Sequence, residues 1–188
     1  MQLLREAIEA RDIPIIAVRD PGSSRIGEQI RGILLNPENT DMAMRCEMLL
    51  YMAARAQLMR DTVLPALANG NFVVSDRFVS STLAYQLGGD RLSAAEIRSV
   101  ANVAIAGRWP DQTILLDMPP AQGASRIQRK MDRIERRPPE YHERVRAHFL
   151  AQAAADPDHF RVINGAQDRQ AVHREIWQAL GALAGESE

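Results

Sequence analysis

Residues 73–86 read Val-Val-Ser-Asp-Arg-Phe-Val-Ser-Ser-Thr-Leu-Ala-Tyr-Gln, a short β-branched run that ends in Asp76-Arg77 and passes into a polar segment with helical spacing. In an open parallel sheet, ligands bind outside the carboxyl ends of the strands. An Asp-Arg pair at such a strand end can serve a metal-bound phosphate and an anionic substrate side by side. The alternative is an ordinary surface ion pair at the end of a strand.

Apolar runs of strand length alternate with stretches of helical spacing along the rest of the chain. We expect strands at residues 15–18, 72–75, 113–117 and 160–163. We expect helices at residues 3–8, 27–35, 42–67, 93–106, 140–154 and 170–184. Strands separated by helices predict an α/β fold with a doubly wound parallel sheet flanked by helices. With no internal repeat and no long linker, residues 1–188 are expected to form one domain.

Composition excludes several classes of protein. Of the 188 residues, 46% are hydrophobic and 25% are charged, and the net charge is −1, so we expect no nucleic-acid or acidic-membrane partner. The single cysteine, Cys46, excludes an internal disulfide and the common zinc spacings, and its apolar surroundings predict a buried, inert thiol. The four histidines are scattered, which favours no metal cluster. No apolar run approaches the roughly 18 residues of a membrane span, so we expect a cytoplasmic protein.

Four short motifs follow one another in a distinctive order. They are RDPG at 19–22 with GEQIR at 27–31, LYMAAR at 50–55, DRF at 76–78 with STLAYQ at 81–86, and DRIE at 132–135. In this order and spacing they resemble the motifs of bacterial thymidylate kinases, which are nucleoside-monophosphate kinases of the P-loop class. The resemblance runs from Leu3 to about Leu183. It implies transfer of the ATP γ-phosphoryl group to dTMP, giving dTDP, with Mg²⁺ accompanying ATP.

The resemblance also implies roles for individual side chains. Arg77 would hold the acceptor phosphate in a bidentate grip, and Asp76 would orient the magnesium shell through water, with no direct protein ligand to the metal. Arg55 would reach the pyrimidine edge while Tyr51 stacks on the ring. For Arg55 the alternative is a solvated residue paired with Glu47 or Asp61, and for Tyr51 it is a place in the core.

Further contacts complete the implied acceptor site. Thr82 would contact the base and Tyr85 the deoxyribose. The remaining substrate-binding residues implied by the motifs are Asp20, Pro21, Ser81 and Gln86. Residues 126–137 resemble the mobile lid, in which Arg126, Arg129 and Arg133 would close over the phosphates, Arg129 and Arg133 with catalytic roles. The alternative for this basic run is a solvated helix face.

The chain also departs from the family pattern. Asp20 stands where the family has glutamate, Ser23 replaces a glycine, and the P-loop motif Gly-x-x-x-x-Gly-Lys-Ser/Thr is absent from the 188 residues. In the family a strand carrying that motif comes before the part that matches Met1 and lies between the strands expected at 72–75 and 113–117. We therefore expect a gap or forced closure between these two strands, and little or no kinase activity from this chain alone.

Three functions remain open at this point. The first is a thymidylate kinase whose P-loop is encoded upstream of Met1. The second is a pseudokinase or nucleotide-binding module of the same fold, and the third is another nucleoside-monophosphate kinase. The expected partners are dTMP, ATP and a second copy of the chain, since the helices at 42–67 and 93–106 could supply an apolar face for a homodimer.

Overall fold

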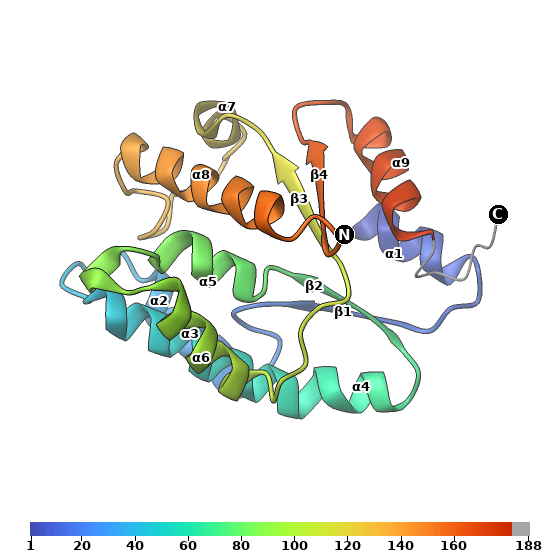
Figure 1. Cartoon of the computed structure of the whole chain (residues 1–188), viewed down its shortest axis with the longest axis horizontal. Helices are drawn as coiled ribbons and strands as arrows, with labels where there is room; N and C mark the ends of the chain where they lie inside the picture. The colour runs from blue at the N-terminus through green and yellow to red at the C-terminus, as the bar shows by residue number, and fades with distance from the viewer. Residues whose placement is uncertain (182–188) are drawn as a thin grey trace.

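The computed structural model describes residues 1–181 and has the alternation of strands and helices that the sequence predicts (Figure 1). The strands are β1 (Ile15–Arg19), β2 (Phe72–Asp76), β3 (Thr113–Asp117) and β4 (Phe160–Asn164). The α-helices are α1 (Gln2–Glu9), α2 (Arg25–Leu35), α3 (Met44–Leu58), α4 (Leu64–Ala68), α5 (Val79–Gln86), α6 (Ala94–Ala104), α7 (Pro120–Ser125), α8 (Pro139–Ala155) and α9 (Arg169–Leu180). The last residues of the helix expected at 170–184 lie outside the described part.

The four strands form two parallel pairs. β1 pairs with β2 from Ile15↔Phe72 to Arg19↔Asp76, and β3 pairs with β4 from Thr113↔Phe160 to Asp117↔Asn164. Within the described residues, β2 and β3 are not hydrogen-bonded to each other, and the two pairs point in clearly different directions (Figure 1). The parallel α/β fold is therefore confirmed, and the break lies between the second and third strands, where the sequence analysis expects it.

Two apolar layers cover the strands. One contains the methionine-rich side of α3 together with α5 and α6, and Val18 of β1 belongs to it. On the other side, α1 and α9 lie next to each other and pack Leu4, Ile8 and Leu180 against residues from both strand pairs (Figure 1). The break between β2 and β3 is thus bridged by helices. No helix in the described range 1–181 is both long and apolar enough to cross a bilayer.

The long helix expected at 42–67 is divided. A π-helical turn, η1 (Met59–Val63), separates α3 from α4. Pro65, in the first turn of α4, has no N–H to donate to the carbonyl of Asp61, so the regular hydrogen-bond ladder is interrupted at this point. The helix expected at 93–106 is α6, and its Ser93–Glu96 capping box is formed.

Cys46 is exposed, so the prediction of a buried thiol was wrong. The buried face of α3 follows Met48, Met52 and Arg55 at helical spacing. Cys46 lies two residues before Met48, about 200° around the helix from it, and so faces away from the core.

Candidate active site

The carboxyl ends of β1 and β2 place two charged loops side by side. Asp20 follows β1, and Asp76-Arg77 closes β2. The strands are parallel and in register to their last residues, and the Asp20 N–H donates to the Asp76 carbonyl at 2.9 Å. The first turn of α5 begins two residues after Arg77, so a loop and a helix frame the same strand end.

Arg77 has an unusual backbone conformation. Its φ is +68°, in the left-handed region that non-glycine residues rarely adopt, and the Ser75 hydroxyl donates to its carbonyl at 2.6 Å. Such strained positions cluster at binding and catalytic sites. The guanidinium lies 5.2 Å from the centre of the Tyr85 ring, and among the described residues Arg77 forms no salt bridge with a carboxylate. Its charge is therefore available to an anionic ligand.

A buried ion pair lies beneath this surface. Arg55 Nε donates to Asp20 Oδ2 at 2.5 Å, and Arg55 Nη2 donates to the Thr82 hydroxyl at 3.1 Å. Both charged side chains are almost fully buried. Burial raises the pKa of the Asp20 carboxyl, and the adjacent Arg55 guanidinium opposes this shift. The other carboxylate oxygen, Asp20 Oδ1, is buried and has no hydrogen-bond partner among the described residues.

These groups line one cavity of about 290 Å³. Most of the side chains that the motifs implicate come together here: Asp20, Pro21, Tyr51, Arg55, Asp76, Arg77, Ser81, Thr82, Tyr85, Gln86 and Arg129. Burial, followed by the nearby Glu47, raises the pKa of Tyr51 to about 12, so its phenol is neutral at physiological pH. The solvated and Glu47- or Asp61-paired alternatives for Arg55 do not describe its surroundings, because it is buried against Asp20.

Two of the three expected lid arginines do not reach the cavity. Arg126 Nη1 donates to the Gly165 carbonyl at 3.1 Å, and Arg133 is turned into the protein, where it pairs with Glu47. Arg129 does line the cavity, and both its terminal nitrogens donate to Glu135, at 2.7 and 2.8 Å. Of the three arginines only Arg129 lines the cavity, because the chain turns at 132–135 and directs Arg133 inward.

The cavity also has lining residues that the sequence analysis did not single out as site residues. They are Arg19, Arg31, Leu35, Asp132, Ile134, Glu135 and His142. Arg31 Nη1 donates to the Pro21 carbonyl at 3.0 Å, and burial, with Arg19 adding to it, lowers its pKa. Arg19 and Arg31 stand inside the RDPG and GEQIR motifs, which could have identified them. For His142, at the start of α8, nothing in its sequence surroundings gives a signal.

Glu28 supports the loop after β1. It is exposed, and its Oε1 accepts hydrogen bonds at 3.0 Å both from Arg19 Nη2 and from the Ser23 N–H. The Ser23 N–H is the main cause of the lowered pKa of Glu28. Its hydrogen bonds go to Arg19 and Ser23 rather than to Arg31.

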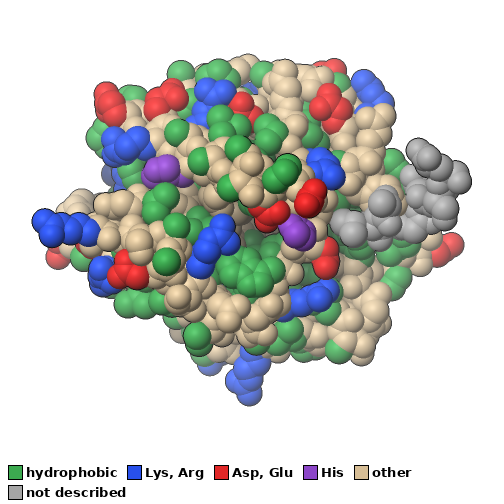
Figure 2. All heavy atoms as spheres, in the orientation of Figure 1, with side chains coloured by type: hydrophobic (Ala, Val, Ile, Leu, Met, Phe, Trp, Pro, Cys, Tyr) green, Lys and Arg blue, Asp and Glu red, His purple; other side chains and the backbone are tan. Residues whose placement is uncertain are grey.

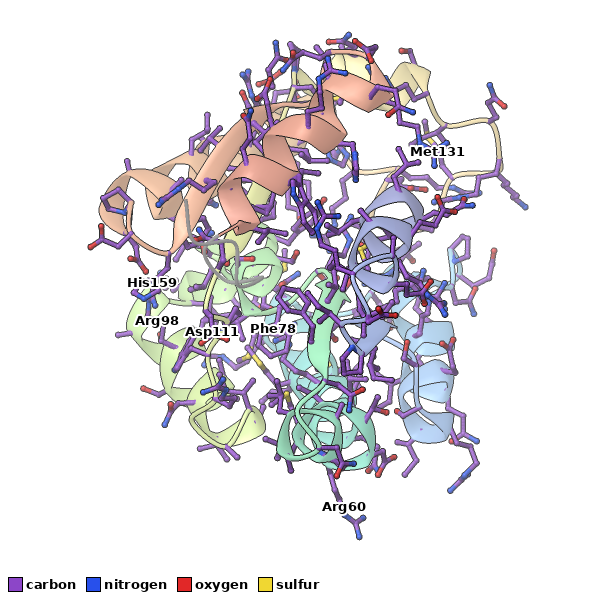
Figure 3. All side chains as sticks on the ribbon, turned by 90° about the vertical axis from the view of Figure 1, so that its right-hand side faces the viewer. Arg60, Phe78, Arg98, Asp111, Met131 and His159 are labelled. Atoms are coloured by element: carbon purple, nitrogen blue, oxygen red, sulfur yellow. The ribbon has the colours of Figure 1, made fainter. Side chains whose placement is uncertain are left out.

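A second cavity, of about 330 Å³, lies at the amino ends of β3 and β4. It is lined by Arg98, Trp109, His159 and residues around them, and it contains none of the site residues that the resemblance implies. Figure 3 shows Arg98, Asp111 and His159 together, well away from Met131 of the lid segment. The face drawn in Figure 2 has a hollow near its middle, with hydrophobic side chains inside and charged side chains around it. The motif residues therefore select the first cavity as the candidate site.

Comparison with known proteins identifies the family of the chain. The family model for thymidylate kinase matches residues 1–176. A thymidylate kinase of Cutibacterium acnes is 41% identical over 182 residues, which are 97% of this chain and 89% of that protein. Thymidylate kinases of Desulforudis audaxviator and Bifidobacterium longum are 41% and 40% identical, over 96% and 98% of this chain and 82% and 91% of their own lengths. The motif order, the parallel α/β fold and these matches together show that the chain belongs to the thymidylate kinase family.

Proposed function

We propose that this protein serves as a dTMP kinase and that the cavity at the ends of β1 and β2 is its acceptor site. Thymidylate kinases transfer the γ-phosphoryl group of ATP to dTMP. Two polyanions must meet in line for this reaction, so the protein's contribution is chiefly charge neutralisation and positioning. The observation that carries the proposal is Arg77, a cavity-lining guanidinium at the end of β2 that forms no salt bridge with any of the described residues.

Arg77 would take the dTMP phosphate, since a planar guanidinium binds two phosphate oxygens at once. Tyr51 would stack on the pyrimidine, as its neutral phenol and position in the cavity wall permit. Arg55 donates from Nε to Asp20, from Nη2 to Thr82 and from Nη1 to the Met52 sulfur. A guanidinium has five N–H groups, so two remain for the base. Thr82, Tyr85, Ser81 and Gln86 would complete the pocket from α5.

Asp76 suits a hydrated magnesium ion that arrives with ATP. Its carboxylate is exposed at the cavity, beside Arg77. One carboxylate at this position fits a contact to a hydrated ion through water. When bound, the ion neutralises charge on the transferred phosphoryl group. Arg129 lines the cavity and would be the lid cation that approaches the phosphates once Glu135 releases one of its nitrogens.

A homodimer is the second part of the proposal. α3 packs against both α2 and α6, and each of the three helices exposes an apolar side chain: Ile33 in α2, Leu49 in α3 and Val103 in α6. We propose that these three helices form the contact between two copies. A cytoplasmic setting, which the single cysteine favours, goes with this assignment.

Ligand-dependent thermal stability tests the acceptor site without requiring turnover. At one hundred times its dissociation constant, dTMP should contribute about 2.7 kcal/mol to stability, with smaller shifts for dUMP and dAMP. Arg77→Ala should lose most of the dTMP shift. Arg60→Ala is the matched control, because Arg60 is exposed in η1 and points away from the molecule (Figure 3). An unchanged shift in Arg77→Ala would remove Arg77 from the site, and an equal shift with dAMP would favour another nucleoside-monophosphate kinase.

A further inference from the structure

One buried carboxylate fastens the lid segment to the body of the protein. The Glu47 side chain in α3 is fully buried, and its Oε2 accepts hydrogen bonds from Arg133 Nη2 at 2.5 Å and from Arg137 Nη2 at 2.6 Å. Both arginines lie in or at the end of the lid, about ninety residues further along the chain. A single oxygen of α3 thus holds two points of a segment that covers the cavity.

The other oxygen of Glu47 reaches the cavity wall. Glu47 Oε1 accepts from Gln86 Nε2 at 2.7 Å. A carboxylate can only accept here, so Gln86 must turn its amide nitrogen towards Glu47 and its oxygen the other way. That Gln86 oxygen is buried and has no partner among the described residues, while Gln86 itself lines the cavity. Glu47 therefore contacts the lid and the acceptor pocket at the same time.

Further hydrogen bonds attach the two lid arginines to different helices. Arg133 Nε donates to the Leu34 carbonyl at 2.8 Å, and Arg137 Nη1 donates to the Tyr141 hydroxyl at 2.5 Å. The Tyr141 hydroxyl in turn donates to the Tyr85 carbonyl at 2.8 Å. Residue 133 is thereby tied to α2 and residue 137 to α5 and α8. Glu135 lies between these two tied residues, and it lines the cavity together with Arg129, which donates to it.

We propose that Glu47 is a positioning residue, which holds the lid over the acceptor cavity and keeps Arg129 and Gln86 in place for the reaction. The inference rests on the proposed function for its consequence in catalysis, but its structural part can be tested on the ligand-free protein. Removing the Glu47 charge would leave two guanidiniums without their shared partner, one of them buried, a change that is strongly unfavourable in protein interiors.

Amide hydrogen exchange of the full chain measures the attachment directly. In Glu47→Gln, amides of residues 126–137 should exchange about ten-fold faster or more, as expected for a segment that opens locally. Amides of β4 and α9 should keep their wild-type rates. Glu9→Gln is the matched control, because it also removes one carboxylate from an ion pair, an exposed one with Arg5 at 2.7 Å, far along the chain from the lid.

Two more variants separate positioning from general stability. Glu47→Gln/Arg133→Met removes the buried charges on both sides, so it should recover unfolding stability while lid exchange stays fast. If lid protection returns together with stability, Glu47 is only a structural group and the proposal is overturned. Arg137→Gln leaves the Glu47–Arg133 pair in place and should loosen the lid partially. Wild-type lid exchange in that variant would overturn the proposal as well.

Adding dTMP distinguishes failure of this inference from failure of the proposed function. Saturating dTMP should slow lid exchange further in the wild type and should bind Glu47→Gln about ten-fold more weakly, a difference of about 1.4 kcal/mol. If dTMP leaves the wild type unchanged, the acceptor assignment fails while the ligand-free comparison still decides the role of Glu47. If dTMP binds both proteins equally well, the lid is not positioned for the acceptor and the inference fails.

Discussion

Arg55 is the residue around which the proposed acceptor pocket is organised. Its guanidinium is buried between Asp20 of the loop after β1 and Thr82 of α5, so three separate segments share one charge. The motif around residues 50–55 predicted that this arginine belongs to the site. It could not predict the ion pair, because Asp20 lies 35 residues away and only the fold brings the two together.

Arg55→Met should therefore destabilise the fold as well as weaken the pocket. Leaving the Asp20 carboxylate buried without its partner costs about 3–5 kcal/mol. Urea unfolding curves of the wild type, Arg55→Met and Asp20→Asn/Arg55→Met would measure this, and the double variant should recover part of the loss. A loss below about 1 kcal/mol in the single variant would mean that the pair contributes no more than a surface salt bridge.

The lid arginines show where sequence reasoning at single residues stops. A run of basic residues predicts cations near phosphates, and Arg129 lies where that prediction puts it. Arg133 differs because an acidic side chain some 86 positions earlier is buried within reach. Neither the spacing nor the charge of the run carries information about Glu47, so the inward turn of Arg133 could not be foreseen.

At the scale of elements, features that depend on neighbouring residues were predicted correctly, and features that depend on residues distant in the sequence were not. The Ser93–Glu96 pair predicted the start of α6, since a capping box depends only on residues three apart. The π-helical turn before Pro65 was missed, although the proline itself was visible, because hydrophobic periodicity continues through it. The tether between α8 and β3 was also missed, as Arg146 and Asp117 lie 29 residues apart.

That tether makes stability depend on pH. Arg146 donates to both oxygens of Asp117, at 2.7 and 2.8 Å, and these hydrogen bonds lower the pKa of Asp117 below its ordinary value of 3.8. The pKa of Asp117 is lower in the folded than in the unfolded protein. The stabilisation is therefore fully present above about pH 4–5 and is lost as the pH falls through the folded-state pKa. Asp117→Asn should thus be less stable than the wild type at pH 7, and the difference should shrink towards pH 3.

Unfolding followed at pH 7, 5 and 3 checks this expectation. Asp168→Asn is a useful comparison, because the Asp168 pKa is also lowered, by the Ala171 and Gln170 N–H groups at the start of α9, and an amide can keep those hydrogen bonds. It should change stability less at pH 7. A constant difference between Asp117→Asn and wild type at all three pH values would show that ionisation of Asp117 plays no part.

At the scale of the whole molecule, the order of the elements follows from the sequence, but the orientation of the two strand pairs does not. Alternating patterns were enough for the order of strands and helices and for the parallel pairing, whereas the break between β2 and β3 was expected from the family resemblance and the absent P-loop motif. The relative direction of the two strand pairs depends on packing between layers, which no local pattern encodes. The expectation that the domain is single, the homodimer and the individual site roles remain predictions.

Self-association can be tested on the helical face formed by α2, α3 and α6. Val103 is 82% exposed, so Val103→Glu should leave the stability of one copy within about 0.5 kcal/mol while it places charge in the proposed contact. The mass measured by analytical ultracentrifugation should then change from that of two chains to that of one chain, 21.0 kDa. Val162→Glu, at an exposed apolar position in β4, should have no such effect. A wild-type protein that sediments as a monomer would contradict the dimer.

Phosphoryl transfer can be tested with and without additional sequence. We expect residues 1–188 alone to release little ADP, because removing one electrostatic donor typically costs 10²–10³-fold and the P-loop supplies several. If the gene encodes Gly-x-x-x-x-Gly-Lys-Ser/Thr upstream of Met1, adding about 20 residues should restore dTMP-dependent ADP release. Rapid turnover by residues 1–188, or an inactive extended chain with an intact P-loop, would contradict this expectation.

The unpaired sides of β2 and β3 have a consequence for handling the protein. Within residues 1–181 each of these strands offers a row of backbone groups that no neighbouring strand satisfies, on Phe72–Asp76 and Thr113–Asp117. Such edges recruit extended backbone from other molecules. Residues 1–188 should therefore become turbid or form fibrillar, thioflavin-positive material as concentration rises. Ser75→Lys should delay the onset of aggregation, whereas a segment that pairs with both strand edges should abolish aggregation.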